Sequence, residues 1–146
     1  MADQSLQREL DSIYETYPVL RAGPAQDAEI AAVERYCGFT LPATYKWFLQ
    51  RYGSAIVGPF QIYGFGQNEA LETITVIEAA ERFSSSNWPG SMDGLAISMD
   101  HAGNPFVLLS DGRIRLYDHD SGETHEVATS FDEFLRQLLT GSGSAR

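Results

Sequence analysis

The sequence predicts an α+β fold, in which a central and mostly antiparallel sheet is flanked by N-terminal helices and a C-terminal helix. Up to residue 52 the apolar residues recur at helical spacing. From residue 60 onward, short alternating or apolar runs separated by turn residues take over, as in a meander of strands. After residue 130 the spacing becomes helical again. Helices at both ends and strands between them define the class.

Three helices are predicted in the N-terminal region. The first covers residues 5–17, whose apolar residues share one face and which ends before a proline. The second covers residues 24–37 and opens at Pro24, because proline is favoured in a first helical turn. Gly38 follows as its C-terminal cap. The third opens with another proline and covers residues 42–52.

The rest of the chain reads as strands with one closing helix. Residues 74–83 are ambiguous, and a helix is favoured for their second half. Asp111-Gly112 predicts a hairpin with a type I′ turn. Ser130, followed three residues later by Glu133, predicts a capping box that opens the last helix. The predicted strands, in chain order, are residues 60–65, 95–99, 105–109, 113–117 and 126–128.

The length of 146 residues fits a single domain, expected over residues 1–140, with a flexible tail over residues 141–146. The hydrophobic fraction of 43% is that of a globular chain. No apolar run reaches the length of roughly 18–20 residues that a bilayer requires. The N-terminus lacks the basic start and apolar stretch of a secretory signal. We therefore expect a cytoplasmic protein without a membrane segment.

The chain is acidic, with 20 Asp and Glu against 10 Lys and Arg and a net charge of −10. Most of this charge lies in residues 67–126, where eleven acids face three arginines. Nucleic acids and anionic membranes would repel such a chain, which argues against both as partners. Two interpretations remain open: a surface that keeps the protein soluble, or a face that meets a basic partner.

No residue pattern indicates catalysis, a metal site or a bound cofactor. The three histidines, His101, His119 and His125, lie among acids, but no two have the spacing that places both on one helix face. Cys37, the sole cysteine, falls at a helix C-terminus on the apolar stripe, which favours a core residue over a nucleophile. The oxygens of residues 100–104 could bind a cation, but these residues are also ordinary turn formers.

The region from Ile30 to Gly53 resembles the signature of the SUKH superfamily, which includes fungal cell-wall-synthesis regulators and many bacterial immunity proteins. The matching pattern is Ile30-x-x-Val33-Glu34-x-x-x-Gly38-Phe39-Thr40-Leu41-Pro42-x-x-Tyr45-x-x-Phe48-Leu49-x-x-Tyr52-Gly53. Three later segments match in order: residues 62–65, residues 97–106 and residues 127–135. One departure is the turn after the third helix, where many members carry Asn-Gly and this chain has Tyr52-Gly53-Ser54.

This resemblance implies a SUKH-like fold and a binding protein rather than an enzyme. Short bacterial members are typically immunity proteins, which neutralise a toxin delivered between competing cells. The expected function is therefore to bind a cognate polymorphic toxin and to block its active site, with a basic toxin such as a nuclease suiting the acidic region. The alternative, suggested by the fungal relatives, is a non-catalytic adaptor or regulatory scaffold.

The partner-binding residues are expected around a tryptophan within the acidic region. Among the loops, Trp88 is the best candidate for an interface anchor, while the other role left open for it is that of a core tryptophan that caps the sheet. The candidate residues for the partner interface are Glu69, Glu72, Trp88, Asp93, Asp118, Asp120 and Glu123.

Overall fold

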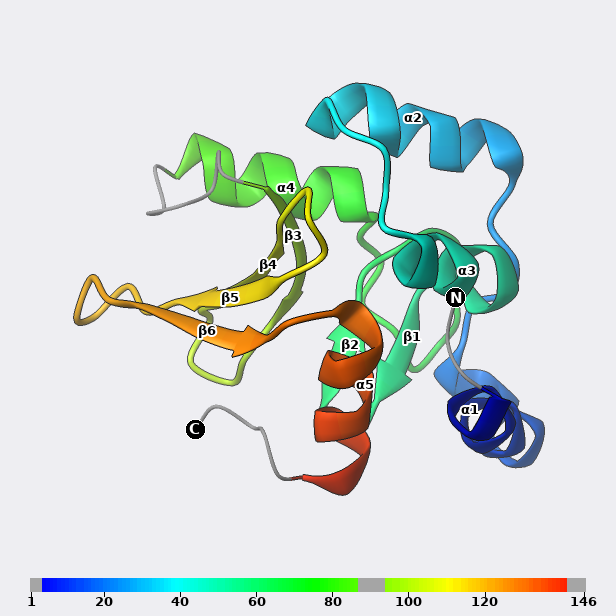
Figure 1. Ribbon diagram of the computed structural model, residues 1–146. Coiled ribbons are helices and arrows are strands. Elements are labelled where there is room, and N and C mark those ends of the chain that lie inside the picture. The colour runs from blue at the N-terminus through cyan, green and yellow to red at the C-terminus, as the bar shows by residue number, and fades with distance from the viewer. Residues whose placement is uncertain (1–3, 87–93, 142–146) are drawn as a thin grey trace.

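The computed structural model describes residues 4–86 and 94–141, and three helices open it as predicted (Figure 1). α1 (Gln4–Thr16) buries one apolar face, and a short 3₁₀ turn η1 (Pro18–Leu20) follows it. α2 (Asp27–Cys37) begins three residues later than the predicted start at Pro24. Gln26 is the N-cap, with its backbone N–H donating to the carboxylate of Glu29 at 2.8 Å. The backbone N–H of Ala25 donates to the carbonyl of Leu49, 2.9 Å away, and so ties the stretch before the helix to α3.

The junction between α2 and α3 (Ala43–Tyr52) matches its sequence signals closely. Gly38 caps α2 in a left-handed conformation with φ of 82°. The side chain of Glu34 then accepts a hydrogen bond from the backbone N–H of Leu41, at 2.9 Å. Leu41 is buried under α2, and Pro42 stands at the N-cap rather than inside α3.

A small hairpin follows, and the sequence predicts only the second of its two strands. β2 (Phe60–Ile62) pairs with β1 (Ala55–Val57), a strand too short to show any periodicity. The predicted strand over residues 60–65 ends early because the chain leaves this hairpin after Ile62. The N–H of Tyr63 donates instead to the carbonyl of Ile97, at 2.7 Å, and so joins the hairpin to the larger sheet.

The ambiguous stretch over residues 74–83 is a helix in all but its first residues. α4 (Val76–Ser85) begins after Thr75, whose hydroxyl accepts the N–H of Glu78 at 3.1 Å. The carboxylate of Glu78 accepts the N–H of Thr75 in return, at 2.9 Å. This complete capping box stabilises the start of the helix, although the β-branched residues there favour a strand.

The main sheet contains four antiparallel strands in the order β3-β4-β5-β6. Their bounds are β3 (Leu95–Met99), β4 (Pro105–Leu108), β5 (Ile114–Tyr117) and β6 (Thr124–Ala128). The predicted type I′ turn at Asp111-Gly112 is wrong. The N–H of Gly112 donates to the carbonyl of Leu109, so a three-residue loop precedes Arg113, with Gly112 at φ of 97° after the turn.

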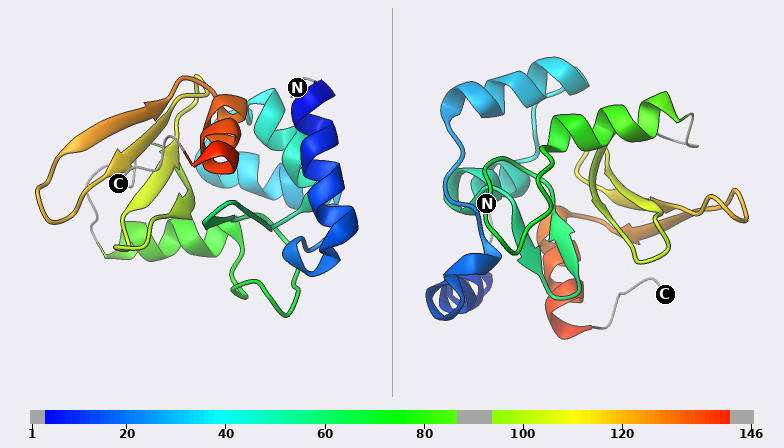
Figure 2. Two further views of the ribbon diagram at one scale, coloured as in Figure 1. Left: turned by 90° about the horizontal axis from the view of Figure 1, so that it is seen from below. Right: turned by 180° about the vertical axis from the view of Figure 1, so that it is seen from behind.

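α5 (Phe131–Thr140) closes the chain and packs against α3, β1 and β6 (Figure 2). Its cap differs in detail from the predicted box. Ser130 accepts the N–H of Glu133, but the Glu133 carboxylate turns to the N–H and hydroxyl of Thr129. Gly141 caps the other end, and the remainder of the predicted tail lies outside the described residues.

One apolar core unites these elements, with α4 and β2 packed against β3 and α5 packed against β6. It contains the aromatic residues of α3 and α5 together with the inward side chains of β3, β4 and β5. A separate, smaller cluster of Val107, Leu109 and Tyr117 is also buried. None of the helices within the described ranges combines the length and hydropathy needed to cross a membrane.

Candidate functional site

Three of the predicted interface residues meet in the turn between β5 and β6. This turn projects from the body of the molecule in all three ribbon views (Figures 1 and 2). Asp118 begins it and has a structural role, because its carboxylate accepts the backbone N–H groups of Asp120, at 2.9 Å, and Ser121, at 3.4 Å. These hydrogen bonds hold the pKa of Asp118 below its usual value. Asp118 therefore shapes the turn that displays its neighbours.

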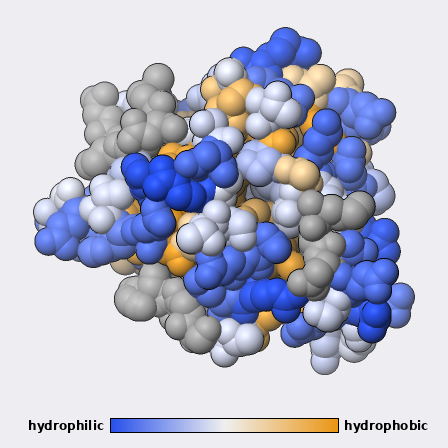
Figure 3. All heavy atoms as spheres, in the orientation of Figure 1, coloured by the Kyte–Doolittle hydropathy of each residue, from blue (hydrophilic) through white to orange (hydrophobic). Residues whose placement is uncertain are grey.

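Asp120 and Glu123 are the carboxylates that this turn displays. Their side chains are 82% and 67% exposed. The nearest cationic candidates are imidazoles, with His119 Nε2 at 3.3 Å from Asp120 and His125 Nε2 at 3.6 Å from Glu123. Within residues 4–86 and 94–141, neither carboxylate forms an ion pair with a lysine or an arginine. Hydrophilic side chains cover this end of the molecule in Figure 3.

The other predicted residues do not join this cluster. Glu69 and Glu72 lie in the connection between β2 and α4, on the opposite side of the molecule from the β5–β6 turn (Figure 2). Glu72 is 3.9 Å from Arg82, so part of its charge is compensated. Trp88 and Asp93 lie outside the described residues. The structure thus brings together Asp118, Asp120 and Glu123, and separates Glu69 and Glu72 from them.

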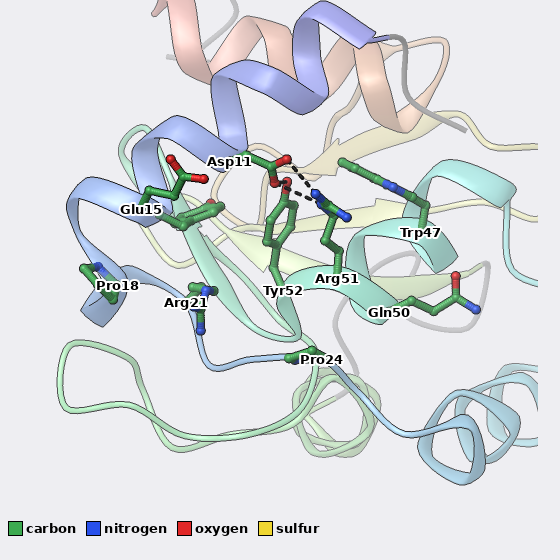
Figure 4. Close-up of a pocket in the computed structure, with 10 residues that line it drawn as sticks. Asp11, Glu15, Pro18, Arg21, Pro24, Trp47, Gln50, Arg51 and Tyr52 are labelled. Carbon is green, nitrogen blue, oxygen red and sulfur yellow. Dashed lines mark hydrogen bonds and ion pairs between the residues drawn. The ribbon is translucent and has the colours of Figure 1, made fainter.

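A second surface feature, which the sequence did not reveal, is an open groove of about 800 Å³ between α1, α3 and η1 (Figure 4). We call it the α1–α3 groove. Acidic, basic and aromatic side chains line it, so the groove does not favour a ligand of one particular charge. Its lining residues are Asp11, Tyr14, Glu15, Pro18, Arg21, Pro24, Trp47, Gln50, Arg51 and Tyr52.

Asp11 organises the floor of the α1–α3 groove. Its carboxylate accepts two hydrogen bonds from Arg51, Nε at 2.9 Å and Nη2 at 2.6 Å, and a third from the Tyr52 hydroxyl at 2.6 Å. The hydrogen bonds from Arg51 make the largest contribution to a lowered pKa for Asp11. Burial and the hydrogen bond to Asp11 raise the pKa of Tyr52. The network joins α1 to α3 across forty residues of sequence.

Replacing Asp11 with asparagine should lower the free energy of unfolding by about 1–2 kcal/mol at neutral pH, since charge-assisted hydrogen bonds to a partly exposed carboxylate are lost. The folded-state pKa of Asp11 is lowered, so its stabilisation is present above the unfolded-state pKa and lost as the pH falls through the acid range. Urea unfolding at neutral and acidic pH measures this. The gap between wild type and Asp11→Asn should shrink in acid.

Glu9→Gln supplies the matched control, because Glu9 is an exposed carboxylate on the same helix. It should change the stability by less than about 0.5 kcal/mol at either pH. Equal effects of Asp11→Asn and Glu9→Gln would show that the network does not stabilise the contact between α1 and α3.

The remaining chemical groups have structural partners. The Cys37 thiol lies beside the carbonyls of Glu34 and Phe39, at 3.9 Å and 3.5 Å, and burial raises its pKa, which disfavours the thiolate. Asp100 accepts the N–H groups of Ala102 and Asn104, both at 2.9 Å, as a turn residue does. Among the described residues, no three His, Cys, Asp or Glu side chains are grouped to hold a metal ion.

The comparisons with known proteins agree with the resemblance noted in the sequence. The family model SUKH_5, described as SMI1-KNR4 cell-wall, matches residues 5–140. No match is found among curated proteins. The family match covers every helix and strand from α2 to α5 and nearly all of α1. This chain therefore belongs to the SMI1-KNR4 family of the SUKH superfamily.

Proposed function

We propose that this protein is an immunity protein, which binds a cognate toxin domain in the cytoplasm and blocks the toxin's active site without catalysis of its own. Family membership supports a role of this kind, because short bacterial members of the superfamily typically neutralise toxins. The observation that carries the proposal is the projecting β5–β6 turn, where Asp120 and Glu123 are exposed and lack a lysine or arginine partner among the described residues.

The charge of the partner follows from the same observation. Uncompensated carboxylates on a projecting turn create a local negative potential that attracts a basic surface over several ångströms. The net charge of −10 adds to this attraction at long range. A toxin that acts on nucleic acid carries a basic cleft for the phosphates, so a nuclease domain is the partner class that these charges fit best.

The test first examines the neighbouring genes for a large toxin and takes the C-terminal domain of that toxin as the candidate partner. Expressed alone, that domain should stop the growth of a host cell, and co-expression of this chain should restore growth. The two purified proteins should also form a stable complex on a sizing column. A toxic domain that still kills in the presence of this chain, and that forms no complex with it, would overturn the proposal.

Replacing Asp120 and Glu123 together with lysine should lower the association rate for the toxin domain by about tenfold at low salt, because charges at an interface rim mainly set the rate of encounter. Stopped-flow or surface-based kinetics at low and high salt measure this. The wild-type rate should fall as salt is added, while the variant's rate should change little. We leave Asp118 unchanged because it holds the turn.

The matched control reverses Glu9 and Asp27, two exposed acids on α1 and α2. It changes the net charge by the same amount at a distance from the turn. A loss of rate as large as that of the Asp120 and Glu123 variant would mean that total charge, and not the turn, attracts the partner.

The α1–α3 groove favours a second candidate function, that of an adaptor that holds a peptide segment of another protein. Trp47 offers a half-buried ring at its wall, and Arg21 has no carboxylate partner within the described part of the chain. Arg21→Glu should leave toxin binding intact under the main proposal. Loss of binding in Arg21→Glu, with normal binding after reversal of Asp120 and Glu123, would favour the adaptor.

A further inference from the structure

The outer edge of β6 is the open end of the main sheet. β6 is last in the strand order β3-β4-β5-β6, and β5 is its only strand partner within residues 4–86 and 94–141. The opposite edge is covered, because the N–H of Tyr63 donates to the carbonyl of Ile97 in β3 and α4 packs against that strand. Figure 2 shows β6 along the outside of the sheet and leading into the projecting turn.

The register identifies the backbone groups that face outward. The N–H of Asp118 donates to the carbonyl of Glu123 at 2.9 Å, so the next pair, Tyr117 and Thr124, is a non-hydrogen-bonded pair. Alternation then makes His125 the residue whose N–H and carbonyl face β5. Thr124 and Glu126 consequently direct their N–H and carbonyl groups away from the sheet.

The pairing of β4 with β5 gives the same result independently. The N–H of Leu109 donates to the carbonyl of Arg113 at 2.9 Å, which turns the backbone of Arg113 and Arg115 toward β4. Leu116 is the next residue of β5 after Arg115, so its backbone N–H and carbonyl face the other way, toward His125 of β6, its partner in the register. The two hydrogen bonds therefore lead to the same conclusion, that the backbone N–H and carbonyl of Glu126 face outward.

This open edge has a definite end. The ladder shifts register near Ile114, and the side-chain Nε2 of Gln137 in α5 donates to the carbonyl of Val127 at 2.9 Å. Gln137 thus occupies the edge at Val127 and leaves the stretch from Thr124 to Glu126 accessible. All three residues of that stretch are exposed.

Acids outnumber arginines beside the open edge, where Arg115 is the register partner of Glu126 and Arg113 forms an ion pair with it. Asp120 and Glu123 precede β6 in the turn, and Glu126 lies within the strand with a side chain 44% exposed. Glu126 shares Arg113 with Asp111, so one guanidinium serves two carboxylates there. An added strand at this edge would meet several acids, and a strand rich in lysine or arginine would therefore be favoured.

We propose that the β6 edge binds an extended basic segment of the partner protein, which adds to the sheet as a further strand beside Thr124–Glu126. The inference rests on the proposed function in taking the toxin domain as the partner, and it names the surface and the mode of binding. Backbone hydrogen bonds to Thr124 and Glu126 would supply the affinity, and the neighbouring acids would select a basic strand over a neutral or acidic one.

A first experiment tests the edge without the toxin. The full chain, labelled with ¹⁵N, is titrated with a short peptide of alternating lysine and valine, and amide hydrogen exchange is recorded by NMR. The amides of Thr124 and Glu126 should exchange more slowly on binding, whereas that of His125 should change little because it already pairs with β5. A matched peptide of alternating glutamate and valine should have no effect. Unchanged exchange at Thr124 and Glu126, or an equal effect of both peptides, would overturn the inference.

A second experiment uses the toxin domain with Thr124→Pro and its control Thr124→Ala. Proline removes the outward N–H, which the sheet itself does not use, whereas alanine keeps that N–H and loses the same side chain. Thr124→Pro should bind the toxin domain about tenfold more weakly than Thr124→Ala, the scale of a hydrogen bond left unmade. Protection of the His125 amide from exchange verifies that β6 still pairs in the proline variant.

The outcomes separate the two proposals. If both variants bind the toxin domain as tightly as the wild type does, the β6 edge is not the binding surface while the immunity function stands. If the wild type binds no toxin domain, the proposed function fails, and the peptide experiment still decides whether the edge accepts a basic strand.

Discussion

Replacing Phe131 with alanine should lower the free energy of unfolding by about 3–5 kcal/mol, the range typical of a large aromatic side chain removed from a core. Phe131 is 1% exposed at the start of α5. Its ring meets Tyr45 edge-on, with centroids 5.1 Å apart, and Phe48 in the same way at 5.5 Å. Both partners belong to α3, so the substitution weakens the contact that holds the last helix against the third.

Urea unfolding followed by tryptophan fluorescence and circular dichroism measures this loss. Phe131→Leu is the first control, since it keeps most of the buried volume and should cost markedly less. Tyr17→Ala is the second, because Tyr17 is 59% exposed and its removal should change stability by less than about 0.5 kcal/mol. A loss below about 1 kcal/mol in Phe131→Ala would contradict the central place of this ring in the core.

Sequence reasoning succeeds in this chain where a signal is local. Gly38 and Ser130 mark the end of one helix and the start of another, and the structure places a helix boundary at both. These caps act through backbone groups a few residues away, so the sequence alone contains the whole interaction. The α+β class and the SUKH resemblance follow from such signals and are confirmed.

The errors in the fold concern features that no periodicity in the sequence marks. Pro24 is an acceptable first helical residue, but α2 begins only after Gln26, and a hydrogen bond between Ala25 and Leu49 ties the preceding segment to α3. The strand β1 is three residues long and exists through its pairing with β2. The contact of Ala25 with Leu49 has no local pattern because Leu49 lies far along the chain, whereas β1 is missed because three residues are too few to show a periodicity.

The candidate site illustrates the same limit. A sum of charges over residues 67–126 predicts an acidic face, but it cannot show that Asp118 serves the turn or that Glu72 lies near Arg82 on another side. The α1–α3 groove depends on Asp11 meeting Arg51 across forty residues, and the open backbone groups of β6 depend on the register of two hairpins. Only the folded chain contains this information.

A single backbone junction holds the N-terminal segment, α3 and the small hairpin together, and Gly53 lies at its centre. Gly53 ends α3 with φ of 70° and ψ of −134°, a backbone conformation that residues other than glycine rarely adopt. Around it, Gly23 donates to the carbonyl of Tyr52 at 2.8 Å. Ser54 donates to the carbonyl of Phe65 at 3.0 Å. A Cβ on Gly53 would overlap the carbonyl oxygen of Gly23 and lie 2.7 Å from that of Phe65.

Gly53→Ala should therefore lower the free energy of unfolding by about 3–5 kcal/mol, because strained backbone and broken hydrogen bonds add to the steric overlap. The atoms in the way are backbone atoms, which cannot move without separating these segments. Gly103→Ala is the matched control: its φ of 87° is also positive and unfavourable for alanine, but nothing lies within 4 Å of the added carbon. It should cost only about 1–2 kcal/mol, the conformational part alone. Thermal unfolding of both variants measures the difference, and similar losses in the two would show that the junction around Gly53 yields to a side chain.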